Sequence, residues 1–119
     1  MAKPSIEQIK VLLSNEKIRI QISNDTDIDQ QHLQKIESLN SIELEKIQSN
    51  VQYWIHHYGE QIETYASQYD YEINPIQITA VENLYLVEII DDEPQFFDSK
   101  DQAIKYADEN IGRFFVDDE

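Results

Sequence analysis

The sequence contains no cysteine, and its 119 residues include only two glycines, Gly59 and Gly112. The absence of cysteine excludes disulfides, thiolate metal ligands and cysteine nucleophiles. Two isolated glycines cannot form a phosphate-binding loop of any known spacing, and no Gly-x-Ser-x-Gly nucleophile turn is present. The chain therefore lacks the motifs of the common nucleotide-binding and hydrolytic enzymes.

Long apolar runs are also missing. No run approaches the roughly 18 apolar residues that a membrane-spanning helix needs. The first seven residues, Met-Ala-Lys-Pro-Ser-Ile-Glu, lack the apolar segment of a secretory leader, so we expect a cytoplasmic protein. With 119 residues, 40% of them hydrophobic, the chain is long and apolar enough to fold as a single domain over residues 1–119.

Positive charge is the third shortage. The chain has 24 Asp and Glu against 9 Lys and Arg, which gives a net charge of −15. Residues 1–46 hold 8 acids and 6 bases (−2), whereas residues 47–119 hold 16 acids and 3 bases (−13). Lys and Arg are absent from residues 47–99, which carry ten acids. This asymmetry favours a positively charged partner, because nucleic acids and anionic membranes would both be repelled.

The N-terminal pattern predicts a helix followed by a strand. Ser5 and Gln8 form a capping box ahead of an apolar stripe with helical spacing, which predicts a helix over residues 5–15. Residues 17–22, Lys-Ile-Arg-Ile-Gln-Ile, alternate strictly between polar and apolar. That alternation is typical of a strand with one buried face.

Two further helices are predicted before residue 70. Turn-forming residues 23–27 precede a second helix, whose buried face is marked by Leu33, Ile36 and Leu39. Ser41 is the expected cap of the next helix, which apolar residues at intervals of three and four extend over residues 42–69. Gly59 lies inside this predicted helix, and we expect a kink or a close approach of another backbone there.

The C-terminal part predicts a sheet and a final helix. After Asn74-Pro75, apolar residues predict three strands, over residues 76–80, 84–90 and 95–97, with a turn at 91–94. Ser99 and Gln102 repeat the capping box, and the inward positions of the helix that follows are Ala103, Ile104, Ala107 and Ile111. Gly112 predicts a left-handed helix end, before a last edge strand at 113–116.

The predicted fold class follows from this order of elements. We expect an α+β domain with about four helices, one of them long, packed on a small and mostly antiparallel sheet. No internal repeat and no linker interrupts it.

Candidate catalytic and metal-binding residues are few. His56 and Glu60 are four residues apart, so on one face of the predicted long helix they could hold a metal ion from two positions. Two ligands do not complete a site, and we expect one histidine to pair with Glu60 instead. No pattern selects a carboxylate pair for acid–base chemistry. We therefore expect no enzymatic activity, no metal and no cofactor.

The acidic residues suggest a different role. DNA carries one negative charge per roughly 1.7 Å of helix axis, and carboxylates on rigid elements can imitate that array. Helical neighbours three or four residues apart are about 5–6 Å apart at Cβ, a spacing that Glu60 and Glu63 meet in the predicted helix. We predict a partner-binding acidic surface that consists of Glu60, Glu63, Asp70, Glu72, Glu88, Asp91, Asp92, Glu93, Asp98, Asp101, Asp108, Glu109, Asp117 and Asp118.

In size, acidity, cysteine-free composition and lack of a catalytic motif, the chain resembles the small bacterial DNA-mimic proteins, in particular the monomeric kind that binds the histone-like protein HU. The resemblance covers the whole chain in character and involves no signature motif. It implies a monomer whose acidic face competes with DNA for HU and so tunes the packing of the nucleoid.

Two other functions share the same acidic face. One is an immunity protein that neutralises a nuclease toxin, and the other is a phage-type anti-CRISPR inhibitor of a nucleic-acid-guided complex. An immunity protein would bind one toxin very tightly through a few dominant residues. A DNA mimic would bind more weakly, lose affinity as salt rises and be displaced by duplex DNA.

Overall fold

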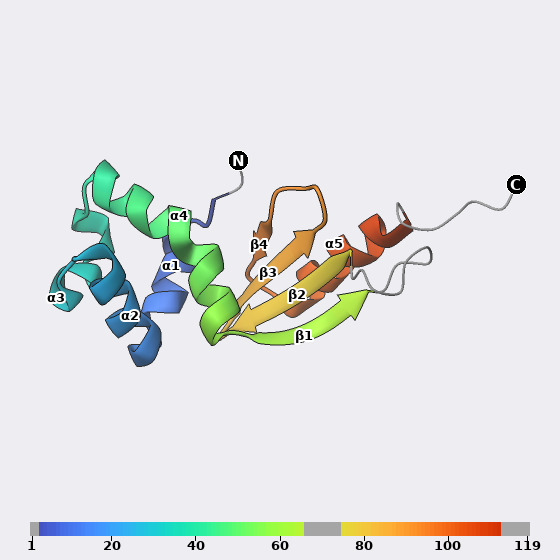
Figure 1. The fold of residues 1–119 in the computed structure, drawn as a ribbon, viewed down its shortest axis with the longest axis horizontal. Coiled ribbons are helices and arrows are strands. Elements are labelled where there is room, and N and C mark those ends of the chain that lie inside the picture. The colour runs from blue at the N-terminus through green and yellow to red at the C-terminus, as the bar shows by residue number, and fades with distance from the viewer. Residues whose placement is uncertain (1–2, 66–74, 113–119) are drawn as a thin grey trace, which may run out of the picture.

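The computed structural model describes residues 3–65 and 75–112 and has the predicted α+β class. The elements form two groups along the long axis of the molecule (Figure 1). The helical end contains α1 (Ile6–Leu13), α2 (Glu16–Thr26), α3 (Gln30–Leu33), the short 3-10 helix η1 (Ile36–Ser38) and α4 (Ser41–Tyr58). The sheet end contains β1 (Glu60–Tyr65), β2 (Ile76–Val81), β3 (Leu84–Ile89), β4 (Gln95–Phe97) and α5 (Lys100–Ile111).

Helix α1 begins at the predicted capping box. The Ser5 side chain accepts a hydrogen bond from the Gln8 backbone N–H, and the Gln8 side chain accepts one from the Ser5 N–H in return. The Gln8 amide also donates to the carbonyl oxygen of Phe96 and to Oδ1 of Asp98, at 3.3 and 3.1 Å. This one side chain therefore caps α1 and ties it to the end of β4.

The strand predicted over residues 17–22 is wrong, because this segment lies in helix α2. Asn15 caps the helix by accepting a hydrogen bond from the Ile18 N–H. Ile18 and Ile22 are four residues apart and buried, whereas Ile20 is 39% exposed. In a six-residue segment the same alternation places two apolar residues on one helical face. Most of the predicted turn at 23–27 also belongs to α2, which ends at Thr26.

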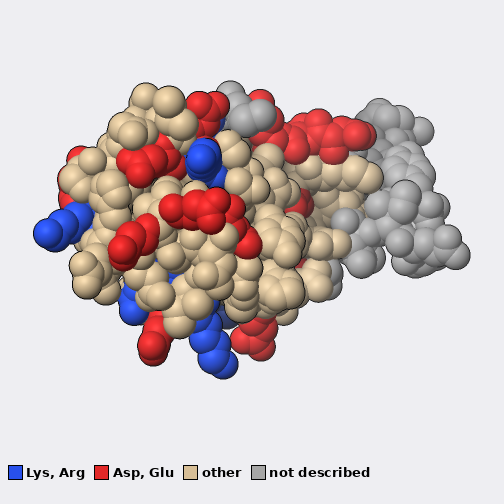
Figure 2. All heavy atoms as spheres, turned by 60° about the vertical axis from the view of Figure 1, so that its left-hand side comes forward, with Lys and Arg blue, Asp and Glu red and all other residues tan. Residues whose placement is uncertain are grey.

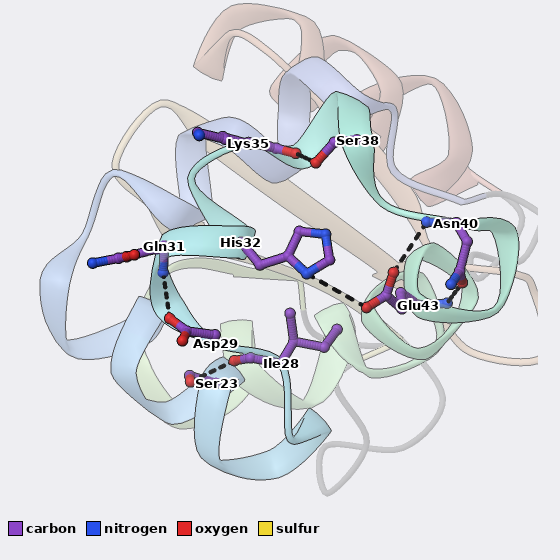
Figure 3. Close-up of polar contacts among 9 residues, drawn as sticks. All are labelled: Ser23, Ile28, Asp29, Gln31, His32, Lys35, Ser38, Asn40 and Glu43. Atoms are coloured by element: carbon purple, nitrogen blue, oxygen red, sulfur yellow. Dashed lines mark hydrogen bonds and ion pairs between the residues drawn. The ribbon is translucent and has the colours of Figure 1, made fainter.

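The second predicted helix is divided into two short pieces, α3 and η1 (Figure 3). Asp29 caps α3 through the Gln31 N–H at 2.8 Å, and Leu33 and Ile36 are buried as predicted. The cap of α4 is Asn40 and not Ser41. Asn40 and Glu43 form a capping box, which also brings the Glu43 carboxylate within 3.7 Å of Nδ1 of His32.

The long helix predicted over residues 42–69 is also wrong, because α4 ends at Tyr58 and the chain continues as β1. Gly59 marks the change and has an extended backbone. A Cβ atom at Gly59 would collide with the carbonyl oxygen of Ile55 and lie 2.8 and 2.9 Å from methyl groups of Thr79 and Val81. The crowding at Gly59 therefore comes from a carbonyl of α4 itself and from side chains of β2, and neither the expected kink nor the approach of another backbone accounts for it.

The sheet has the strand order β1-β2-β3-β4, and every neighbouring pair is antiparallel. The three strands predicted after Pro75 are confirmed as β2, β3 and β4. Residues of β3 serve two buried clusters: Leu84 and Leu86 pack with the helical end, whereas Val87 and Ile89 pack with α5. The sheet thus separates the two clusters and contributes to both.

Helix α5 begins at Ser99, whose side chain accepts a hydrogen bond from the Gln102 N–H as predicted. Its predicted inward residues pack on the sheet: Ala103 and Ala107 are buried, and Ile104 and Ile111 are partly buried. Gly112 follows the helix with a φ of −58°, so the predicted left-handed end is wrong. The strand predicted at 113–116 lies outside the described residues.

Left-handed backbone occurs at three acidic residues within the described chain. Asp27 ends α2 with a φ of 58°, Glu82 lies in the β2–β3 turn with 52°, and Asp91 lies after β3 with 66°. Aspartate tolerates this region better than most residues, because its short side chain bonds locally. In a chain with two glycines, acids therefore occupy the turns that glycine commonly fills.

Candidate functional site: an acidic surface

The predicted acidic surface divides into three groups in the structure. Asp70, Glu72, Asp117 and Asp118 lie outside the described residues. The other ten acids lie on the edge strand β1 (Glu60, Glu63), at the end of β3 and in the β3–β4 turn (Glu88, Asp91, Asp92, Glu93), and around α5 (Asp98, Asp101, Asp108, Glu109). The ten acids thus lie on different elements of the sheet end, and Glu60 and Glu63 are not on a helix.

The first group lies on an edge of the sheet. Glu60 and Glu63 are exposed and pair by register with Ala80 and Ile78 of β2, with an irregularity between residues 61 and 63. The helical spacing predicted for them is wrong, because β1 is a strand. Their partners on β2 are two residues apart, so at about 3.3 Å per residue the two positions lie about 7 Å apart along the strand.

The second group contains three exposed acids and one partly buried acid. Asp91, Asp92 and Glu93 are exposed in the turn, which the Asp92 N–H stabilises by donating to the Ile89 carbonyl oxygen at 3.0 Å. Glu88 differs, since its side chain is only 21% exposed. It faces helix α4 and is held there by two polar side chains.

The partners of Glu88 come from one face of α4. Nε2 of Gln52 donates to Oε2 of Glu88 at 2.6 Å, and Nε2 of His56 lies 2.8 Å from the same oxygen. Oε1 of Glu88 is buried and has no hydrogen-bond partner among the described residues. The predicted pairing of a histidine with Glu60 is wrong. Because α4 ends at Tyr58, Glu60 leaves the helix and His56 pairs with Glu88 instead.

The third group shares its helix with bases. Asp101, Asp108 and Glu109 are exposed on α5, and so are Lys100 and Lys105. Asp98, just before the helix, accepts the hydrogen bond from Gln8. This helix therefore presents both signs of charge, unlike the sheet beside it.

The two ends of the molecule differ in charge. Residues 60–65 and 75–99 carry eight acids (Glu60, Glu63, Glu82, Glu88, Asp91, Asp92, Glu93 and Asp98) and no Lys or Arg. Figure 2 shows bases scattered among acids over the helical end, whereas acids towards the sheet end gather along one upper margin. Glu82 is an exposed member of this set that the predicted surface omitted.

Some acids of the helical end are neutralised internally. Lys10 of α1 pairs with Glu37 of η1 and, at 3.3 Å, with Glu7 of its own helix. The bond from Lys10 lowers the pKa of the Glu37 carboxyl, and the same carboxylate, followed by Glu7, raises the pKa of Lys10. The negative field of the helical end is thereby reduced.

A groove lies between α4 and the β3–β4 turn. It consists of two adjoining cavities of about 280 Å³ each, and both are lined by Gln52 and Pro94. One of them, the Glu88 cavity, is also lined by His56, Gln77, Glu88, Ile89, Ile90, Asp92 and Pro75. The other, the Phe96 cavity, is also lined by Lys3, Gln48, Ser49, Glu93 and Phe96. Gln52 and His56 were not predicted as site residues, although their i,i+4 spacing indicates a shared helix face.

Residues 3–65 and 75–112 contain no group of three or more His, Cys, Asp or Glu side chains that could hold a metal ion. Within the same ranges, no helix has the length and apolar character needed to cross a membrane.

Comparisons of the chain with protein families, with curated proteins and with solved structures found no match.

Proposed function

We propose that this protein is a DNA mimic, whose acidic sheet end occupies the DNA-binding site of a basic nucleic-acid-binding protein in competition with DNA. The histone-like protein HU is the partner that we propose first, on the resemblance described above. The observation that supports the proposal is the charge of the sheet end: eight acids and no base on residues 60–65 and 75–99.

The mechanism is replacement of phosphates by carboxylates. Lys and Arg side chains that otherwise hold the DNA backbone would pair with acids fixed on β1, on β3 and in the β3–β4 turn. The spacing of about 7 Å along the strand between positions 60 and 63 is about twice the 3.4 Å charge spacing of one DNA strand. The protein would therefore engage a subset of the partner's cations and bind with a shallower salt dependence than DNA itself.

Capture from a bacterial lysate tests the proposal most directly. Immobilised protein is incubated with lysate at low salt, and bound proteins are eluted with duplex DNA. We expect a basic nucleic-acid-binding protein in the eluate, with HU as the first candidate. Recovery of no such protein would refute the proposal. Capture of a nuclease that the protein inhibits and that duplex DNA does not release would support the immunity alternative instead.

A displacement assay with purified HU tests the position of the surface. The protein should displace HU from a fluorescently labelled duplex. The triple variant Asp91→Asn, Asp92→Asn, Glu93→Gln should do so about tenfold less well, because each exposed ion pair with the partner contributes a few tenths to about 1 kcal/mol. The matched control changes the same charge at the helical end, through Glu7→Gln, Glu16→Gln and Glu45→Gln. Equal losses in the two triple variants would indicate that net charge alone drives binding.

A further inference from the structure

The groove between α4 and the β3–β4 turn has the chemistry to hold one particular side chain. The Glu88 cavity contains the carboxylate of Glu88, with the exposed Asp92 in the same lining. The Phe96 cavity is lined by Pro94, Phe96 and Ser49, and also by one base, Lys3, and one acid, Glu93. A long side chain with an apolar stem and a cationic tip matches this sequence of surfaces.

The bonding state of Glu88 indicates what kind of tip fits. A carboxylate has about four acceptor positions, and Oε2 already accepts from Gln52 and lies against His56. Oε1 has no donor among the described residues and is screened from solvent. An ionised oxygen in that condition is costly. A donor in the Glu88 cavity would gain a charge-assisted hydrogen bond to it once the carboxylate rotates to expose this oxygen.

We propose that the groove takes an arginine side chain of the partner, with the guanidinium group at Glu88 and the methylene stem against Pro94 and Phe96. This inference takes from the proposed function only that the partner is basic. Arginine suits the groove better than lysine, because its planar group presents several donors in a fixed fork and is more weakly hydrated. Anions are disfavoured by the carboxylates of Glu88 and Asp92.

Short peptides test the groove without the partner. The probes are N-acetyl-Gly-Arg-Gly-amide and its counterparts with lysine and with citrulline, the uncharged analogue of arginine. NMR titration of the whole chain should show that the arginine peptide shifts the side-chain signals of Gln52 and His56. The lysine peptide should bind more weakly, and the citrulline peptide should leave both signals unchanged. Equal binding of the arginine and citrulline peptides would overturn the proposal.

Two pairs of variants locate the binding. Glu88→Gln should weaken binding of the arginine peptide about tenfold or more, whereas Glu109→Gln on α5 removes the same charge and should change it less than about twofold. If Glu88→Gln impairs folding, Ser49→Phe provides an independent test, because it fills the Phe96 cavity from an exposed helix position. Asn50→Phe, one residue along and outside the lining, is its control. Equal effects within either pair would refute an arginine site in the groove.

The outcomes separate this inference from the proposed function. If the arginine peptide binds as described but no nucleic-acid-binding protein is captured, the groove is supported and the DNA mimic is wrong. If the protein displaces HU from DNA and the Glu88→Gln variant displaces it equally well, the DNA mimic is supported and the arginine site in the groove is refuted.

Discussion

Gly59 illustrates how a single residue determines where one element ends and the next begins. Its φ of −84° is available to any residue, so the backbone conformation does not require glycine. The requirement comes from space, because a Cβ atom there would collide with the Ile55 carbonyl oxygen and press on methyl groups of β2. Gly112 is the opposite case, with open space around a helical backbone.

We predict that Gly59→Ala destabilises the protein by about 1–3 kcal/mol, the usual cost of overpacking. Gly112→Ala should be neutral or stabilising by up to about 1 kcal/mol, since alanine lowers the entropy of the unfolded chain. Urea unfolding followed by the fluorescence of Trp54, the single tryptophan, measures both. Equal effects of the two substitutions would contradict the steric account of Gly59.

A second prediction at this scale concerns Glu37. The bond from Lys10 lowers the pKa of the Glu37 carboxyl, so this interaction favours folding above the ordinary range of a glutamate and is lost as pH falls through the lowered pKa. In Lys10→Met, the pKa of Glu37 should rise to its ordinary range. An NMR pH titration of the Glu37 side chain measures the change, and Lys17→Met is the control. An unchanged pKa would show that the pair is not formed in solution.

Helix α4 is the element that joins the two ends of the molecule. Trp54 is fully buried, and its Nε1–H donates to Oδ2 of Asp25 on α2 at 2.8 Å. Tyr58 donates to Oε1 of Gln21 on the same helix at 3.0 Å. On another face of α4, Gln52 and His56 hold Glu88 of β3, so one helix positions both the helical end and the groove.

We predict that Asp25→Ala destabilises the protein by about 1–3 kcal/mol, because it leaves the buried indole N–H of Trp54 without its acceptor. Glu45→Ala, which removes an exposed acid from α4, should change stability by less than about 0.5 kcal/mol. Urea unfolding measures both variants. If Asp25→Ala is as stable as Glu45→Ala, then water or another group satisfies Trp54.

At the scale of the whole molecule, one end carries most of the unbalanced charge. Like charges repel in the folded state, and a net charge of −15 destabilises a compact chain. Ion pairs such as Lys10–Glu37 relieve part of this repulsion at the helical end. The described strands and turns of the sheet end contain no base that could do the same.

We therefore predict that added salt stabilises the protein. Between about 0.01 M and 1 M NaCl the Debye length falls from about 30 Å to about 3 Å, so Tm at pH 7 should rise. The rise should be smaller in the triple variant of Asp91, Asp92 and Glu93 than in the helical-end variant of Glu7, Glu16 and Glu45. Thermal unfolding by circular dichroism gives both values. A fall in Tm with salt would mean that ion pairs outweigh the repulsion.

The elements with unambiguous local signals could be predicted from sequence. Ser5 and Ser99 begin helices because their capping partners lie three residues away, and the strands after Pro75 are apolar segments separated by turn residues. The strand prediction for residues 17–22 failed because six alternating residues are compatible with both the helical and the strand period. The site could be predicted only as a set of acids, since Glu88 and its partners on α4 are 32 and 36 residues apart in sequence.

The sequence by itself determined the charge, its concentration in the C-terminal part of the chain, and the absence of thiol and phosphate-binding motifs, because these properties depend on composition alone. Only the tertiary structure decided how far apart the acids lie and which of them faces a cavity. Spacing depends on whether a residue lies in a helix or a strand, and at Gly59 that choice rests on side chains of β2, about 20 residues further along the chain.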